Sequence, residues 1–87
     1  MKSAALEHAK QKIRVNAICP GFTHTELVDA AIEAVPHVFD KLVADDIPMG
    51  RIAETDEIVR AVLWLCSDEA SFVTGQALAA DGGFLAR

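Results

Sequence analysis

The sequence predicts an α/β fold in which parallel strands are connected by helices. Two short apolar stretches, residues 13–19 and 76–80, are typical of buried strands. Helical periodicity lies between them, from residue 26 to about 44 and again from 55 to about 66. Two strands joined by a helical crossover of this length pair in parallel. The predicted order is therefore helix, strand, helical segment, helix and strand.

The first eleven residues predict a helix that leads into the first strand. Alanine and leucine dominate this stretch, and a turn is expected near Gln11. Nothing before the helix provides a cap, so we expect it to be the end of a longer helix. The strand from Ile13 to Cys19 is expected to be buried on both faces in its second half, as parallel strands usually are. Pro20 lacks a backbone donor and is expected to end the strand pairing.

Helical periodicity returns after a loop of small and hydroxyl residues. Thr25 is the predicted N-cap of this second helix, because a side-chain hydroxyl accepts from the free amides of a first turn. Pro36 is expected to interrupt the helix, and a further helical run continues from His37 to about residue 44. Residues 45–50 are predicted as a loop. Thr55 is the predicted N-cap of the third helix.

Composition limits the chain to at most one small domain and excludes several functions. The 87 residues are 52% hydrophobic, so we expect some apolar surface to meet another chain or an absent part of the same fold. A net charge of −5 without a basic stripe excludes a nucleic-acid interface. No apolar run is long enough to cross a membrane, and no spacing indicates a metal site. Cys19 and Cys66 are expected to be reduced core thiols of a cytoplasmic protein.

The loop that follows the first predicted strand is the candidate functional site. Open α/β sheets bind ligands beyond the carboxyl ends of their strands, where a loop leads into a helix. Gly21 allows a close backbone approach, and hydroxyls with free amides at a helix N-terminus suit a polar or anionic ligand. Thr25 is also explained as a helix cap alone, and the two roles are compatible.

Four sequence blocks, taken together, resemble the carboxyl-terminal third of the short-chain dehydrogenase/reductase family. In order they are SAALEHAKQKIRVNAICPG, PGFTHT, PMGRIAETDEI and TGQALAADGG. Each block alone is weak, but their order and spacing are specific and cover nearly the whole chain. The resemblance implies a carboxyl-terminal fragment of a Rossmann-like, doubly wound parallel sheet. Residues 1–87 would then form a single partial domain, incomplete as a fold.

The resemblance also implies that the candidate loop closes over the nicotinamide end of NAD or NADP. Pro20 and Gly21 would shape the loop, and the backbone of Thr23 would bind the nicotinamide carboxamide. The hydroxyl of Thr25 would bind the carboxamide or the neighbouring phosphate. Asn16 would have a structural hydrogen-bonding task in the strand rather than a catalytic one.

The segment from residue 26 to about 47 resembles the family's variable lid over an alcohol or carbonyl substrate. For His24 no partner carboxylate is apparent at a useful spacing, so we expect a surface or lid histidine rather than an acid or base. Arg51 resembles the family's structural arginine. The candidates to line the substrate side are Phe22, His24, Leu27 and Val28.

The family's catalytic motifs do not occur in these 87 residues. The chain has no tyrosine, so the family's Tyr-x-x-x-Lys pair is absent, and no G-x-x-x-G-x-G motif is present. We therefore predict no catalytic residue, and a portion of an NAD(P)-dependent oxidoreductase that is inactive alone. The alternative is a non-catalytic truncated module that associates with full-length relatives. The resemblance also implies a homo-oligomer, a dimer or tetramer, or association with full-length relatives. Separately, the monomer is expected to fold poorly because the edge of its first strand has lost its neighbours.

Overall fold

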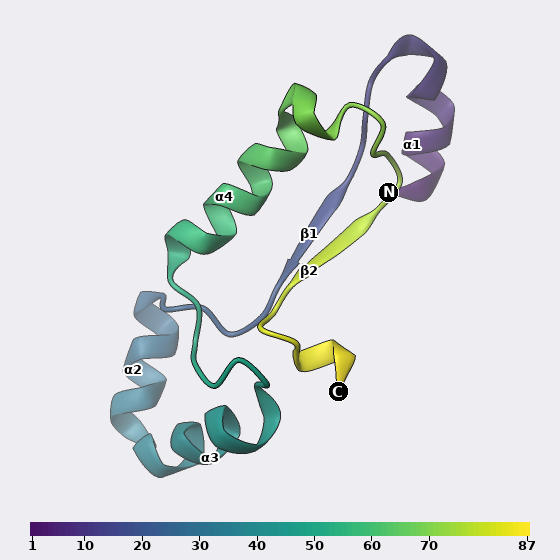
Figure 1. Ribbon diagram of the computed structural model, residues 1–87. Helices are drawn as coiled ribbons and strands as arrows, with labels where there is room; N and C mark the ends of the chain where they lie inside the picture. The colour runs from purple at the N-terminus through teal and green to yellow at the C-terminus, as the bar shows by residue number, and fades with distance from the viewer.

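Two short parallel strands form the centre of the molecule, and helices lie around them (Figure 1). The structure is a computed structural model that describes residues 1–87, and its order of elements is the predicted one. Three short 3-10 turns, at Ala9–Gln11, Asp68–Ala70 and Phe84–Ala86, join or end the main elements. The helices and strands are α1 (Lys2–His8), β1 (Ala17–Pro20), α2 (Glu26–Ala34), α3 (Pro36–Asp46), α4 (Thr55–Cys66) and β2 (Ala77–Ala80).

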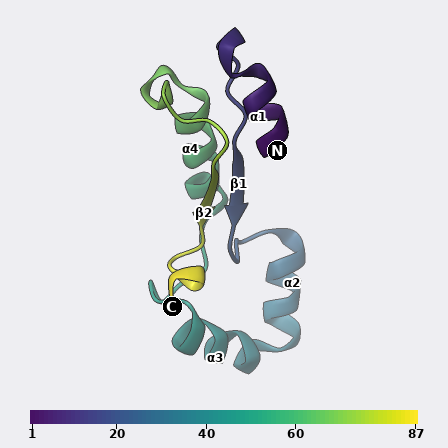
Figure 2. The same ribbon diagram turned by 90° about the vertical axis from the view of Figure 1, so that its right-hand side faces the viewer.

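The strands run from the end of the molecule that carries α1 toward the end that carries α2 and α3 (Figure 2). Strand β1 pairs with β2 from Ala17 opposite Ala77 to Pro20 opposite Ala80. Pairing therefore continues through Pro20, contrary to the prediction. The amide of Gly21 donates to the Ala80 carbonyl at 3.0 Å, so the odd-numbered amides face β2. The nitrogen of Pro20 faces the opposite edge, where β2 requires no donor.

Asn16 takes over the pairing ahead of β1, which begins four residues later than predicted. Its side-chain amide donates to the Val73 carbonyl at 2.9 Å, and its side-chain oxygen accepts from the Gln76 amide at 3.0 Å. The predicted structural task of Asn16 is thereby confirmed. Because a side chain satisfies these backbone groups, residues 15 and 16 lie alongside residues 73–76, just ahead of β2, without forming a regular ladder.

Arg14 joins the amino end of β1 to the carboxyl end of α4. Its guanidinium donates to the carbonyl of Leu65 at 2.7 Å and to that of Ser67 at 3.0 Å. The last carbonyls of a helix have no partner within the helix, and a cation there also complements the helix dipole. Arg14 therefore holds the end of α4 in position beside β1, against which α4 packs.

The helix starts and ends agree only partly with the predictions. Thr25 caps α2 as predicted, since its hydroxyl oxygen accepts from the Val28 amide at 3.2 Å. Glu54, and not Thr55, caps α4, because its side chain and that of Glu57 form a reciprocal capping box.

The proline break falls where it was predicted, but the helix after it is longer. Pro36 occupies the first turn of α3, where a missing amide costs nothing, and the helix continues through Asp46. The prediction that Asp45 and Asp46 lie in a loop is therefore wrong. The guanidinium of Arg87 lies 3.3 Å from the Asp46 carboxylate, and the buried Ile47 follows directly. These contacts hold the last turn of α3 against the rest of the chain.

Very little of the chain is buried. The buried residues are five of the 87, namely Ala5, Ile47, Ile52, Leu65 and Ala70, whereas the side chain of Phe72 is fully exposed. Cys19 and Cys66 are free thiols, but both are exposed, so the prediction of core thiols is wrong. The radius of gyration is 15.9 Å, against about 12 Å for a compact chain of this length. The expected surplus of apolar surface is thus confirmed. None of the helices is long and apolar enough to cross a membrane.

Candidate functional site

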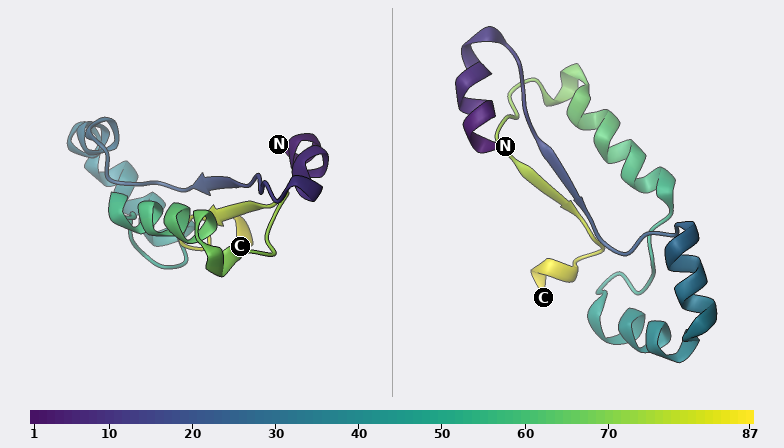
Figure 3. Two further views of the ribbon diagram at one scale, coloured as in Figure 1. Left: turned by 90° about the horizontal axis from the view of Figure 1, so that it is seen from above. Right: turned by 180° about the vertical axis from the view of Figure 1, so that it is seen from behind.

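A cleft of about 570 Å³ lies at the carboxyl end of β1, between the loop that leads to α2 and the turn that follows β2. Figure 3 shows these two segments leaving the same end of the strands. All four predicted cofactor-binding residues line the cleft, as do two of the substrate-side candidates, Phe22 and Val28. His24 and Leu27 do not line it. The lining residues are Cys19, Pro20, Gly21, Phe22, Thr23, Thr25, Val28, Asp81, Phe84 and Leu85.

Gly21 is required by a close backbone approach to Asp81. A β-carbon at Gly21 would lie 2.8 Å from both the Cα and the Cβ of Asp81, a distance that real contacts do not reach. The carboxylate of Asp81 accepts from the amide of Gly83 at 3.0 Å and from that of Leu85 at 3.1 Å. Gly21 therefore sets the spacing between the two walls of the cleft, and Asp81 shapes the second wall.

Thr23 presents its amide to the surroundings rather than to the chain. Ala53 pairs with the residues on either side of it: the Ala53 amide donates to the Phe22 carbonyl at 3.0 Å, and the His24 amide donates to the Ala53 carbonyl at 2.8 Å. The Thr23 amide has no acceptor within the chain. Its hydroxyl donates to the Gly21 carbonyl at 3.0 Å, which fixes the loop. A fixed loop with a free amide suits a ligand with a hydrogen-bond acceptor.

Thr25 lies where α2 begins and lines the cleft beside Thr23. Its oxygen accepts from the Val28 amide, so its proton remains available to donate to a ligand. The first amides of a helix carry partial positive charge, which favours an anionic or carbonyl group. Capping and ligand binding are therefore compatible in this geometry.

His24 has a carboxylate partner that the sequence interpretation missed. Its Nδ1 lies 2.6 Å from Oδ1 of Asp29, five residues later. This hydrogen bond is the main cause that raises the pKa of His24 above 6.5, with further contributions from the charges of Asp29 and Glu54. With Thr25 as N-cap, His24 and Asp29 occupy the N′ and N4 positions, whose side chains pack together in a hydrophobic staple. The spacing of five residues around a capping threonine was the signal available in the sequence.

Phe22 connects the loop to two other segments. Its ring lies edge-to-face with that of Phe39 on α3, at 6.3 Å between centroids, and with that of Phe84 at 6.2 Å. The guanidinium of Arg87 lies 4.2 Å from the centre of the Phe84 ring. Such aromatic pairs contribute about 0.5–1.5 kcal/mol beyond burial of their surface. The apolar side of the cleft is thus anchored to both α3 and the C-terminal turn.

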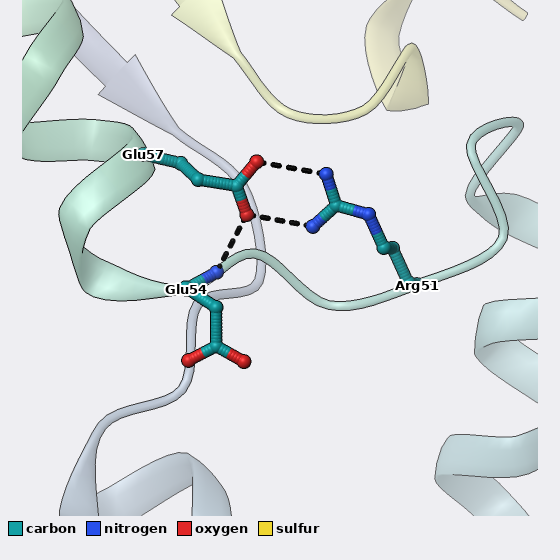
Figure 4. A network of polar contacts seen from close by, with 3 residues as sticks. All are labelled: Arg51, Glu54 and Glu57. Atoms are coloured by element: carbon teal, nitrogen blue, oxygen red, sulfur yellow. Dashed lines mark hydrogen bonds and ion pairs between the residues drawn. The ribbon is translucent and has the colours of Figure 1, made fainter.

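Arg51, ahead of α4, and Glu57, in the first turn of α4, form a bidentate ion pair (Figure 4). The two nitrogen–oxygen distances are 2.6 and 2.7 Å, and the same carboxylate accepts from the Glu54 amide at 2.9 Å. The hydrogen bond from Arg51 is the main reason that the pKa of Glu57 is lowered to about 2. The same hydrogen bond raises the pKa of Arg51. The predicted structural role of Arg51 is confirmed, because the pair fixes the segment that holds the loop through Ala53.

Acid is expected to destabilise the protein through Glu57. A lowered folded-state pKa means that this carboxylate contributes stability above its ordinary value of 4.5, and that the contribution is lost as pH falls toward 2. Glu57→Gln should lower the urea midpoint at neutral pH and have a smaller effect at pH 3. Glu33→Gln, on an exposed α2 carboxylate, should change neither midpoint. Equal losses from Glu57→Gln at both pH values would contradict this assignment.

Comparison with known proteins decides the family. A family model described as "Enoyl-(Acyl carrier protein) reductase" matches residues 1–85. Acetoacetyl-CoA reductase of Shinella zoogloeoides is 48% identical over 82 residues, and short-chain dehydrogenase RED2 of Pyricularia oryzae is 44% identical over 82 residues. The chain belongs to the short-chain dehydrogenase/reductase family. Each match takes in 94% of this chain but only 33% and 29% of those proteins, so the chain spans about a third of their length.

Solved structures of short-chain dehydrogenase/reductases and similar proteins confirm the predicted fold class. The TT0495 protein of Thermus thermophilus is 45% identical with a TM-score of 0.87, over 99% of this chain and 35% of that one. An NADP-bound protein of Agrobacterium tumefaciens is 37% identical with a TM-score of 0.90, over 99% of this chain and 34% of that one. This short-chain dehydrogenase/reductase chain therefore has the carboxyl-terminal part of a Rossmann-like fold.

Proposed function

We propose that this chain supplies the nicotinamide-side wall of the cofactor site in an NAD(P)-dependent short-chain oxidoreductase. One observation carries the proposal: a single cleft brings together Pro20, Gly21, Thr23 and Thr25 at the carboxyl end of β1. Open α/β sheets bind their ligands at this position. The NADP bound to the related Agrobacterium tumefaciens protein supports a nicotinamide cofactor.

The polar groups of the cleft fit a nicotinamide carboxamide. The free amide of Thr23 would donate to the carboxamide oxygen, and the hydroxyl of Thr25 would bind the carboxamide or the neighbouring phosphate. Because Gly21 has no side chain, the loop backbone can lie close to Asp81 in the turn after β2. The cofactor supplies the hydride, which passes to or from an alcohol or carbonyl substrate. Phe22 and Val28 would line the apolar substrate side, and residues 26–47, which include Val28, would form a lid over it.

The 87 residues by themselves are proposed not to catalyse the reaction. A proton must move as the hydride moves, and the family's acid/base tyrosine has no counterpart in a chain without tyrosine. His24 does not replace it, because its ring is paired with Asp29 and lies outside the cleft. The chain would therefore bind and orient the nicotinamide without transferring the proton.

A chimera tests this function. We expect no turnover by the purified chain with NADH or NADPH, and acetoacetyl-CoA reduction when the chain replaces the matching third of the Shinella zoogloeoides reductase. Thr25→Val in the chimera should raise the cofactor KM about two- to tenfold if Thr25 binds the neutral carboxamide, and about tenfold or more if it binds the phosphate. The reason is that a neutral hydrogen bond is worth about 0.5–1.5 kcal/mol and one to a charged group about 1.5–3 kcal/mol. Thr25→Ser should restore it.

Thr25→Asp separates cofactor binding from helix capping. Aspartate caps helices well but has no proton to donate when ionised, so it should keep the stability of the chimera and still raise the cofactor KM. Turnover by the chain alone would contradict the claim of inactivity. An unchanged KM in Thr25→Val would contradict the assignment of the cleft.

A second candidate function is a non-catalytic module that associates with a longer relative or with other copies of itself. The observation that favours it is the exposed apolar side of α4, where Val59, Leu63 and Trp64 are 51, 62 and 43% exposed. A homo-oligomer, a dimer or tetramer, would cover such a surface. The cytoplasm is the proposed compartment, since it keeps free thiols such as Cys19 and Cys66 reduced.

A further inference from the structure

His24 is the point at which three segments are tied together. Its amide donates to the Ala53 carbonyl at 2.8 Å, which joins the loop to the segment ahead of α4. Its ring contacts Asp29 at 2.6 Å, which joins the same residue to the first turn of α2. Thr23 and Thr25, which line the cleft, are its two neighbours in the chain. Whatever fixes His24 therefore fixes the turn that carries both threonines.

The charged groups around the ring are both acidic. Asp29 comes from α2, and Glu54 comes from the segment ahead of α4; both favour the protonated imidazole, whereas desolvation disfavours it. The segment that carries Glu54 is itself held by the Arg51–Glu57 pair. The side chain of His24 is about one-third exposed, so its proton exchanges with solvent. The contact with Asp29 thus bridges a held segment and the start of α2.

We propose that His24 and Asp29 are positioning residues, which hold the turn Thr23–Thr25 and the start of α2 against the cleft more firmly at low pH than at high pH. This proposal rests on the proposed function only for the identity of the ligand in the cleft. The positioning itself is a property of the loop, and no family motif assigned it.

The sign follows from the charge on the ring. The pKa of His24 is raised, so the ionic contact with Asp29 is fully present below pH 6.5 and is lost as pH rises through the raised pKa. Above that pH a neutral ring keeps a hydrogen bond to Asp29 in its Nδ1–H tautomer, but without the attraction between opposite charges. The turn is therefore expected to loosen, rather than to unfold, as His24 loses its proton.

The test is a pH titration of the 87-residue chain by NMR, at a concentration at which it is associated. The amide signals of Thr23, Thr25 and Val28 should move with the same midpoint as the His24 ring, and this midpoint should lie above 6.5. Asp29→Asn should lower the midpoint and uncouple the amide signals from it. It should also speed hydrogen exchange in the first turn of α2 about two- to fivefold, the range expected for an exposed ion pair.

Glu26→Gln is the matched control. Glu26 is also acidic and in the first turn of α2, so its neutralisation removes the same favourable interaction with the helix dipole but not the contact with His24. It should leave the midpoint of His24 unchanged. Equal effects from the two variants would overturn the proposal, as would loop signals in the wild-type chain that do not follow His24. The wild-type titration stands without any variant, so a poorly folded Asp29→Asn chain does not remove the test.

Failure of this proposal is distinguishable from failure of the proposed function. If the chimera does not use a nicotinamide cofactor but the loop amides still titrate with His24, the proposed function is contradicted and the positioning role is not. If the chimera uses the cofactor but the loop amides do not titrate with His24, only the positioning role is contradicted.

Discussion

Dilution is expected to unfold this protein, so its apparent melting temperature should rise with protein concentration. The accessible surface is 6375 Å², against about 5000 Å² for a compact folded chain of this mass. With five residues buried, the isolated chain has too little core to balance the entropy of ordering its backbone. Association that covers the apolar side of α4 would supply the missing burial.

The measurement is a set of thermal melts followed by circular dichroism, from low micromolar to near-millimolar protein. For a dimer we expect a fall of roughly 3–5 °C for each tenfold dilution, and a transition without cooperativity once the monomer dominates. Leu63→Glu, at a 62% exposed position on α4, should lower the melting temperature at every concentration. Glu33→Gln is the control. A sharp transition independent of concentration, from a particle that sediments as a monomer, would refute the expectation.

Gly21→Ala is expected to be the most damaging single substitution in the candidate site. The added β-carbon would meet Asp81 Cα and Cβ at 2.8 Å, and both belong to the stiff start of the turn after β2. Overpacking of this kind costs about 1–3 kcal/mol. The separation needed to relieve it would also displace the carboxylate that holds the amides of Gly83 and Leu85.

Gly50→Ala separates steric overlap from backbone strain. Gly50 has φ of +75° and nothing within 4 Å of an added β-carbon, so alanine there is strained but has room. In the chimera, Gly21→Ala should lose both stability and cofactor binding, whereas Gly50→Ala should lose stability only. Cofactor binding that survives Gly21→Ala would show that the spacing between the two walls is not required.

The sequence predicted the features that depend on neighbouring residues. The order of elements, the cap at Thr25 and the break at Pro36 follow from local periodicity and from the chemistry of single residues. The errors arise where a distant partner decides. Pairing continues through Pro20 because its nitrogen faces away from β2, and a sequence does not show which edge of a strand a given amide faces.

The same distinction holds for the candidate site. The resemblance to a family identified four loop residues that line one cleft, but the opposite wall was missed because Asp81 comes from a turn about sixty residues away. Two of the proposed substrate-side residues, His24 and Leu27, lie outside the cleft. Leu27 lies on the solvent-exposed side of α2. The ring of His24 contacts Asp29 in the first turn of α2 instead of lining the cleft.

The bridge between Thr23 and Ala53 closes the segment between them into a loop whose length and sequence can vary. Its two ends are bonded to each other at 2.8 and 3.0 Å, so their spacing does not depend on the length of the segment between them. Closing a flexible loop costs only about 0.6 kcal/mol more for each doubling of its length. Insertions or deletions near the end of α2, away from the contacts that Phe39 and Asp46 of α3 make, should therefore reshape what the cleft admits while the sheet and the loop keep their positions.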